Sequence, residues 1–145
     1  MTAYKKLDEN ISVTGQLFVD HLDMIKDLGF KTIVCNRPDY EDDIEDQPLS
    51  TEIESRAAEL GMQFSYIPVG GEGPTPEAVQ QTKDVLDGAS GPILAYCLSG
   101  KRSVILASLA KALGGEFATD ELISNALSLG YNLDGLRPTF DSVAA

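Results

Sequence analysis

Apolar residues along the chain follow two repeating patterns. Short apolar runs with the length of buried strands lie at 11–13, 32–35, 63–67 and 93–96. Each run is followed by a segment with apolar residues three or four positions apart, as on one face of a helix, at 18–28, 50–60, 76–88 and 103–113. Strands separated by helices favour parallel pairing. The pattern therefore predicts an α/β fold: a single three-layer domain, residues 1–145, with a mostly parallel central sheet flanked by helices.

Residues that begin or end helices support these boundaries. Gly29 and Gly61 follow the first two predicted helices, and glycine is common just after a helix. Ser50 is expected to cap the second helix, and Thr75, which is followed by proline, to cap the third.

The remaining segments are predicted to be loops and a C-terminal helical region. The segment 37–48 is acidic and holds two prolines, and 68–76 is rich in glycine and proline, so both are expected to be loops. A further helix is predicted at 119–129. The apolar residues of the tail are expected to pack over the sheet; they are Leu133, Leu136 and Phe140.

The net charge of −12, from 23 acidic and 11 basic residues, restricts the classes of partner. Such an excess repels nucleic acid and anionic membrane surfaces, and no apolar run approaches the roughly 20 residues of a spanning helix. Cysteines at positions 35 and 97 are too few for a disulfide framework, and the start MTAYKKLDEN lacks the apolar core of a signal peptide. We expect a cytoplasmic protein that binds neither nucleic acid nor membranes and holds any anion in a local site.

The segment between the strand at 93–96 and the next helix carries the candidate chemistry. It consists of Cys97, Leu98, Ser99, Gly100, Lys101, Arg102 and Ser103. Backbone N–H groups at a helix N-terminus lack helical partners and bind anions, and Gly100 allows a tight turn. The helix and Arg102 are expected to lower the pKa of Cys97 below its free value of about 8.5. Cys97 is therefore predicted to be an activated nucleophile in an anion-binding loop.

Two side chains of this loop have predicted roles beside the nucleophile. The planar guanidinium of Arg102 is expected to bind two oxygens of an oxyanion. Ser103 is expected to hydrogen-bond the thiolate or to ease its departure as a leaving group.

Other interpretations of the segment fit its residues less well. A cysteine at a strand end is commonly part of the core, but Gly, Lys, Arg and Ser directly after it would form a poor core and a good anion cradle. A nucleotide-binding P-loop fails on spacing, because Arg102 stands where Ser or Thr is required and Ala95 where the first Gly is required. One histidine and two separated cysteines do not make a zinc spacing, so neither a metal nor a cofactor is predicted.

Several segments together form a further pattern: Ile11-Ser12-Val13-Thr14-Gly15-Gln16, Asn36-Arg37-Pro38-Asp39, Tyr66-Ile67-Pro68-Val69, the Cys97 loop and Leu136-Arg137-Pro138. They resemble the phosphatase-like domain family of the beta-lactamase hydrolase-like proteins, whose fold is related to tyrosine and dual-specificity phosphatases. The resemblance covers nearly the whole chain. It implies a tyrosine/dual-specificity phosphatase-like fold and a phosphatase-like hydrolase that cleaves phosphate monoesters through a phosphocysteine. Leu98 stands where the family usually has Arg, and Tyr96 where the phosphatases at large favour His.

The reaction that this resemblance implies needs an acid to protonate the leaving group. Glu72 and Asp39 are the candidates for that acid. Four residues separate Cys97 from Arg102, whereas phosphatases of this superfamily have five, and the shorter loop resembles that of rhodanese-type sulfurtransferases. Persulfide transfer on Cys97 needs no such acid and is the alternative to phosphate hydrolysis. A non-catalytic anion or redox sensor is the second alternative.

Two further features bear on redox chemistry and substrate choice. Cys35 ends another predicted strand, so a reversible disulfide with Cys97 is one hypothesis and an ordinary core cysteine is the other. An acidic run is interpreted as a solvated loop that repels phosphorylated macromolecules from the site; it consists of Glu41, Asp42, Asp43, Glu45 and Asp46. We therefore expect a small anionic or thiol-bearing substrate.

Overall fold

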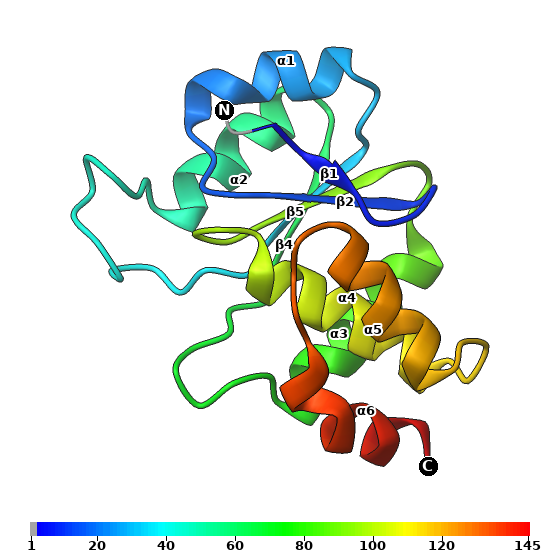
Figure 1. The fold of residues 1–145 in the computed structure, drawn as a ribbon. Coiled ribbons are helices and arrows are strands. Elements are labelled where there is room, and N and C mark those ends of the chain that lie inside the picture. Colours follow the sequence, from blue (N-terminus) through cyan, green and yellow to red (C-terminus); the bar gives the residue numbers. More distant parts are fainter. Residues whose placement is uncertain (1–2) are drawn as a thin grey trace.

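A five-stranded sheet forms the centre of the computed structural model, which describes residues 3–145 (Figure 1). The strands are β1 (Lys5–Lys6), β2 (Ile11–Thr14), β3 (Thr32–Cys35), β4 (Gln63–Tyr66) and β5 (Ile93–Tyr96). Their order across the sheet is β1-β2-β5-β3-β4, and only β1 is antiparallel to its neighbour. Since β5 is the central strand, the segment that follows it emerges in the middle of the carboxyl edge of the sheet.

Helices cover both faces of the sheet. The helical elements are η1 (Val19–His21), α1 (Leu22–Asp27), α2 (Ser50–Glu59), α3 (Pro76–Gly88), α4 (Lys101–Leu113), α5 (Thr119–Ser128), η2 (Asp134–Leu136) and α6 (Arg137–Ala144). Helices α1 and α2 lie on one face and α3 and α4 on the other, with α5 and α6 packed against α4 (Figure 1). The domain therefore has the three layers that the sequence predicts.

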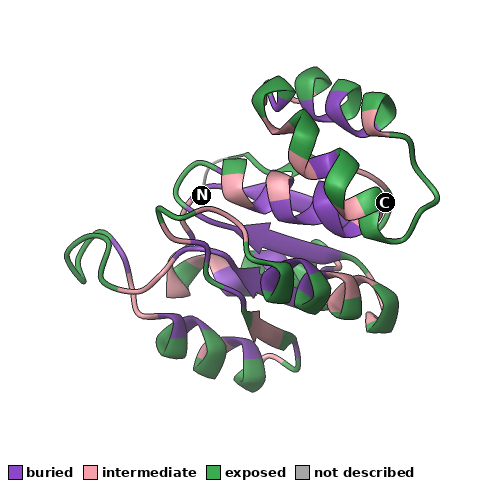
Figure 2. Ribbon diagram, turned by 90° about the horizontal axis from the view of Figure 1, so that it is seen from below, coloured by how far each residue is buried: buried purple, intermediate pink, exposed green. Residues whose placement is uncertain are grey.

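Alternating residues of the central strand divide the core into two clusters. Ile93 and Ala95 pack on the α3 and α4 side, whereas Leu94 and Tyr96 pack on the α1 and α2 side. Every residue of β5 is buried, and so are eight residues of α4. Figure 2 shows buried residues, in purple, gathered in the sheet and on the inner sides of the helices. Burial on both faces explains why the strand is a continuous apolar run rather than an alternating one.

The predicted element boundaries agree closely with the structure. The strands at 32–35 and 93–96 are confirmed, and Thr75 caps α3 by accepting a hydrogen bond from the Ala78 amide at 3.1 Å. The expectation that Ser50 caps α2 is wrong: Leu49 is the capping residue and Ser50 is the first helical residue. Helix α4 begins at Lys101, two residues earlier than predicted.

The two ends of the chain add elements that were not predicted. The pattern indicated neither β1 nor α6, because β1 has only two residues, both polar and exposed, and α6 is eight residues long and largely exposed. The tail residues Leu133, Leu136 and Phe140 do pack against the core on the α4 side. Among the described residues, no helix has both the length and the apolar character needed to cross a membrane.

Candidate active site

Cys97 lies directly after β5, at the base of the loop that leads into α4. Its backbone amide donates to the Thr14 carbonyl of β2 at 3.4 Å, and the residue is 1% exposed. The Gly100 amide donates to the Cys97 sulfur at 3.1 Å. A backbone N–H that points at sulfur stabilises the thiolate form, so the loop provides local support for a nucleophile.

The first turn of α4 contributes further groups to the same loop. Gly100 is the N-cap of α4 in the left-handed conformation, with φ of 92°, and the Ser99 hydroxyl accepts from the Lys101 amide at 3.4 Å. Ser103 is 1% exposed, and among the described residues its hydroxyl has no hydrogen-bond partner. Burying a hydroxyl without a partner lowers the stability of the fold by about 1–3 kcal/mol. This cost is consistent with a hydroxyl that gains its hydrogen-bond partner only during a reaction.

Arg102 is bound by a carboxylate from the loop that follows β3. Its Nη1 donates to Glu41 Oε2 at 2.8 Å and its Nη2 donates to Glu41 Oε1 at 3.0 Å, while Nη1 also donates to the Val69 carbonyl at 3.0 Å. The hydrogen bond to Glu41 raises the pKa of Arg102, and the nearby Cys97 sulfur adds to this effect. Arg102 thus lies between the Glu41 carboxylate and the nucleophile.

The number of donors on Arg102 indicates which edge remains for a ligand. A guanidinium carries five N–H groups. Glu41 accepts one hydrogen of Nη1 and one of Nη2, and Val69 accepts the other hydrogen of Nη1. The Nε–H and the second Nη2–H share one edge of the planar group. This edge can bind two oxygens of an anion held over the Cys97 sulfur.

A second arginine extends the network to β2. The Arg37 side chain is almost fully buried; its Nε donates to Glu41 Oε1 at 3.0 Å and its Nη1 donates to Gln16 Oε1 at 2.9 Å. The backbone N–H of Gln16 donates to the Leu98 carbonyl at 3.3 Å. Two arginines hold the pKa of Glu41 below its usual range, chiefly through the hydrogen bond with Arg102.

Sequence analysis missed these supporting residues. Glu41 was assigned to a solvated acidic run, and it is exposed, but its carboxylate also pairs with two arginines, a role that the sequence did not indicate. Gln16 and Arg37 lie in segments that carry the family resemblance, which was the one signal for them. The other acidic residues of the run are exposed.

Asp39 has a structural position that weakens its candidacy as an acid. Its Oδ1 accepts from the Ser50 amide at 2.8 Å and its Oδ2 accepts from the Ser50 hydroxyl at 2.7 Å, so the carboxylate binds the N-terminus of α2. Tyr40, the next residue, has φ of 67°, which is unusual for a residue other than glycine. Tyr40 separates two acidic residues whose side chains bind different partners: Asp39 binds the N-terminus of α2, and Glu41 binds Arg102.

Glu72 is exposed on the loop between β4 and α3. That loop begins beside the site, because the Val69 carbonyl accepts from Arg102. The Glu72 carboxylate lies back over Gly70, where a Cβ atom would come within 2.8 Å of Oε2. Of the two candidate acids, Glu72 is the one without a helix-capping role, and its loop adjoins Arg102.

Cys35 lies at the end of β3, in register with Tyr96 of β5. Its thiol donates to the Arg37 carbonyl at 3.3 Å, and burial raises its pKa to about 11. Cys35 and Tyr96 belong to the cluster on the α1 and α2 side, and both cysteines are free thiols in this structure. The disulfide between Cys35 and Cys97 stays a prediction.

The exposed residues around the loop, which form its rim, are partly apolar and partly charged. Leu98 is 58% exposed, Tyr40 is 76% exposed, and the Lys101 side chain points to solvent at the start of α4. The acidic segment 41–46 borders the same side through Glu41. The one carboxylate of this segment that reaches Arg102 is that of Glu41.

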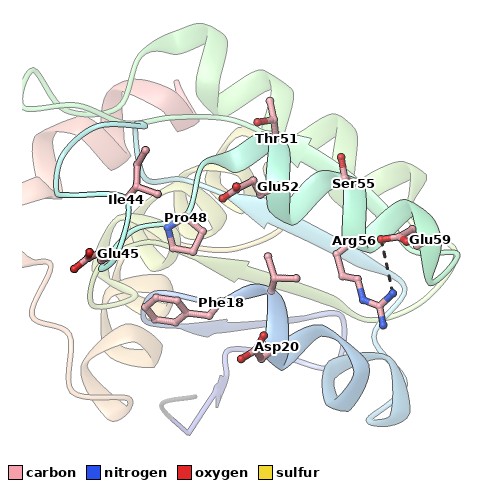
Figure 3. Close-up of a pocket in the computed structure, with 11 residues that line it drawn as sticks. Phe18, Asp20, Ile44, Glu45, Pro48, Thr51, Glu52, Ser55, Arg56 and Glu59 are labelled. Carbon is pink, nitrogen blue, oxygen red and sulfur yellow. Dashed lines mark ion pairs between the residues drawn. The ribbon is translucent and has the colours of Figure 1, made fainter.

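Large surface grooves lie elsewhere on the molecule. One of about 560 Å³ opens between η1, α2 and the acidic loop; Phe18, Ile44 and Pro48 line it, and Arg56 forms an ion pair with Glu59 at 3.7 Å (Figure 3). None of the predicted site residues lines this groove. Within residues 3–145, no cluster of three or more His, Cys, Asp or Glu side chains is placed to hold a metal ion.

Solved structures that share this fold include candidate phosphatases. A candidate phosphatase from Neisseria meningitidis is 33% identical, covers 96% of both chains and superposes with a TM-score of 0.80. The structure of PTPMT1 has a TM-score of 0.75 and covers 98% of this chain and 94% of its own, at 13% identity. The fold is therefore that of tyrosine and dual-specificity phosphatases, as the resemblance implied.

Sequence relatives identify the family. A beta-lactamase hydrolase-like protein from Agrobacterium fabrum is 29% identical over 128 residues, which are 88% of this chain and 29% of that protein. The chain thus spans about three tenths of the length of this curated relative. The model of the beta-lactamase hydrolase-like protein, phosphatase-like domain, matches residues 3–114. The chain belongs to the phosphatase-like domain family of the beta-lactamase hydrolase-like proteins.

Proposed function

We propose that the protein is a cysteine-dependent phosphatase that hydrolyses small phosphate monoesters. The Cys97 sulfur, as thiolate, attacks phosphorus and forms a P–S bond while the P–O bond to the leaving group breaks. The leaving oxygen takes a proton from an acid, and Glu72 is our candidate. Water then gives a proton to the Glu72 carboxylate and attacks the phosphorus of the phosphocysteine, the P–S bond breaks, and inorganic phosphate and the thiolate are released.

One observation carries this proposal: two donors, the Gly100 amide and the Arg102 guanidinium, lie beside the Cys97 sulfur. The Gly100 amide lies 3.1 Å from the sulfur, and the Nε and Nη2 edge of Arg102 is left for oxyanion oxygens once Glu41 and Val69 are bound. Preorganised donors of this kind stabilise the charge that develops on a transferring phosphoryl group. The buried Ser103 hydroxyl offers one more donor for the departing thiolate.

The rim supports a small substrate with an uncharged leaving group. Leu98 and Tyr40 present apolar surface, and the acidic segment 41–46 opposes the approach of polyanions. Lys101 is the exposed cation of the loop itself. A phosphate on a small alcohol or phenol meets these conditions, whereas a phosphorylated nucleic acid or an inositol polyphosphate carries charge that the rim disfavours.

Persulfide transfer is tested by the same assay, because it would use the same cysteine. The four-residue spacing from Cys97 to Arg102 and the freedom from a leaving-group acid support it, whereas a solved structure that is 33% identical is that of a candidate phosphatase. We therefore place phosphate hydrolysis first.

The test compares phosphate release from an aryl phosphate with sulfur transfer from thiosulfate to a thiol acceptor. Cys97→Ser is the blank in both assays, and its thermal unfolding is measured to check that the variant is folded. We expect phosphate release by the native protein and none by the variant. Phosphate release that persists in Cys97→Ser would disprove the role of the cysteine, and sulfur transfer alone would replace phosphatase by sulfurtransferase.

A further inference from the structure

Tyr131 contacts the Cys97 loop from a segment far away in the sequence. It lies between α5 and η2, and its hydroxyl donates to the Ser99 carbonyl at 3.0 Å. Figure 1 shows the chain after α5 returning towards the start of α4. Residue 131 lies beyond residues 3–114, which match the family model.

The carbonyl that Tyr131 binds belongs to the same peptide unit as the amide that binds the nucleophile. The Ser99 oxygen accepts from Tyr131, and the Gly100 N–H donates to the Cys97 sulfur at 3.1 Å. A trans peptide unit is planar, so its C=O and N–H point in opposite directions. A hydrogen bond that fixes the Ser99 oxygen therefore also fixes the direction of the Gly100 N–H.

Gly100 makes an external restraint necessary. Glycine adopts positive and negative φ with similar ease, so the peptide unit before Gly100 can rotate at low cost. Rotation would turn the Ser99 carbonyl towards Cys97 and remove the N–H from the sulfur. Tyr131 also approaches closely, since a Cβ atom on Gly100 would lie 2.6 Å from its hydroxyl oxygen.

Tyr131 is itself held in place. The Lys5 ammonium lies 4.7 Å from the centre of the Tyr131 ring and donates to the Leu129 carbonyl at 2.9 Å. Burial raises the pKa of Tyr131, so the phenol remains a donor at neutral pH. The N-terminal strand and the C-terminal segment thus meet at the tyrosine.

We propose that Tyr131 is a positioning residue for the nucleophile, which keeps the Ser99–Gly100 peptide unit in the orientation that directs its N–H at the Cys97 sulfur. The proposal rests on Cys97 being the nucleophile of the proposed function. It places part of the support of the site in the region after residue 114.

The test measures the rate of alkylation of Cys97 by iodoacetamide as a function of pH, with peptide-level mass spectrometry to separate Cys97 from Cys35. Tyr131→Phe removes the hydroxyl and keeps the ring. We expect its alkylation midpoint to move to higher pH and its turnover of an aryl phosphate to fall roughly three- to tenfold, the size of one hydrogen bond. Tyr4→Phe is the matched control, because the Tyr4 ring packs on Phe30, and it should change neither value.

Thermal unfolding of each variant separates positioning from stability. A lower unfolding temperature with an unchanged alkylation midpoint would show a structural role only and would overturn the proposal. Lys5→Met provides a second variant if Tyr131→Phe does not fold, with a smaller shift expected in the same direction and an unchanged midpoint again contradicting the proposal. A shifted midpoint in a protein without phosphatase activity would support the positioning role and reject the proposed function.

Discussion

The carboxylate of Glu41 binds the guanidinium of Arg102 through two hydrogen bonds, of 2.8 and 3.0 Å, across 61 positions of sequence. The same carboxylate accepts from Arg37, which joins the loop after β3 to the end of β2 through Gln16. The orientation of Arg102 is therefore determined by residues outside the Cys97 loop. Glu41 saturates one edge of the guanidinium and leaves the other for a ligand.

Replacing Glu41 by Gln should lower kcat on an aryl phosphate roughly tenfold, because charge-assisted hydrogen bonds to Arg102 are replaced by weaker ones. Steady-state kinetics measures this, and Glu45→Gln, an exposed residue of the same loop, is the control. The hydrogen bonds from Arg102 and Arg37 lower the pKa of Glu41 below its usual 4.5, so the network should persist at neutral pH and be lost only as the pH falls through that lowered pKa. Equal kinetics for the two variants would exclude this role of Glu41.

Arg102→Lys should reduce kcat/KM by about 100-fold or more, the typical effect of losing one oxyanion donor. Lysine keeps the charge but cannot bind Glu41 and two phosphate oxygens at once. Arg56→Lys on α2 is the matched control, since Arg56 pairs with Asp23 at the surface. Near-normal turnover by Arg102→Lys would contradict the two-pronged geometry described for this site.

Glu72→Gln tests the acid by varying the leaving group. Loss of a general acid should cost on the order of 100-fold with an alkyl phosphate and much less with nitrophenyl phosphate, whose phenolate departs without a proton. Asp39→Asn should instead lower the unfolding temperature, because Asp39 binds the N-terminus of α2. If Asp39→Asn alone shows the dependence on leaving group, the assignment of the acid must be reversed.

Cys35 should make stability depend on pH in the alkaline range. Burial raises its pKa from 9.0 to about 11. Between these values the folded thiol keeps its proton and the unfolded thiol loses it, so rising pH favours unfolding. In Cys35→Ala the slope of the unfolding free energy against pH should be shallower by up to about 1.4 kcal/mol per pH unit, as urea titrations would measure. Identical slopes would show that the thiol is not buried as described.

Leu98→Arg should extend the substrate range towards polyanions. Leu98 is exposed on the rim, and a guanidinium there would offset part of the acidic segment 41–46. We expect KM for a bisphosphorylated substrate to fall more than KM for an aryl phosphate, with Leu98→Met as the uncharged control. An equal change in KM for both substrates would indicate that the charge of the residues around the loop does not select the leaving group.

The sequence alone predicted the sheet and the nucleophilic loop because both depend on local patterns. Strand β5 is recognisable as an apolar run since it is buried on both faces, and the loop after it carries its chemistry in seven consecutive residues. The two-residue strand β1 and the short helix α6 have no such pattern. Tertiary packing alone explains them.

The supporting residues of the site could not be predicted because their partners are distant in sequence. Nothing local distinguishes Glu41 from the four acidic residues that follow it, yet it alone accepts from Arg102. Likewise, Tyr131 lies 32 positions from Ser99, and its position depends on how α5 packs on α4. Such contacts follow from the completed fold and not from any segment of it.

Helix α4 and strand β5 flank Cys97 and are largely buried, and α4 contacts β2, β5, α3, α5 and α6. Amide hydrogens of such elements exchange with solvent mainly through global unfolding, whereas those of exposed loops exchange through local opening. Cys97 and Arg102 should therefore stay in place until the whole domain melts. The exposed carboxylates of the two surrounding loops that do not bind Arg102 should fluctuate on a much shorter timescale, so that entry to the site can vary while its floor remains rigid.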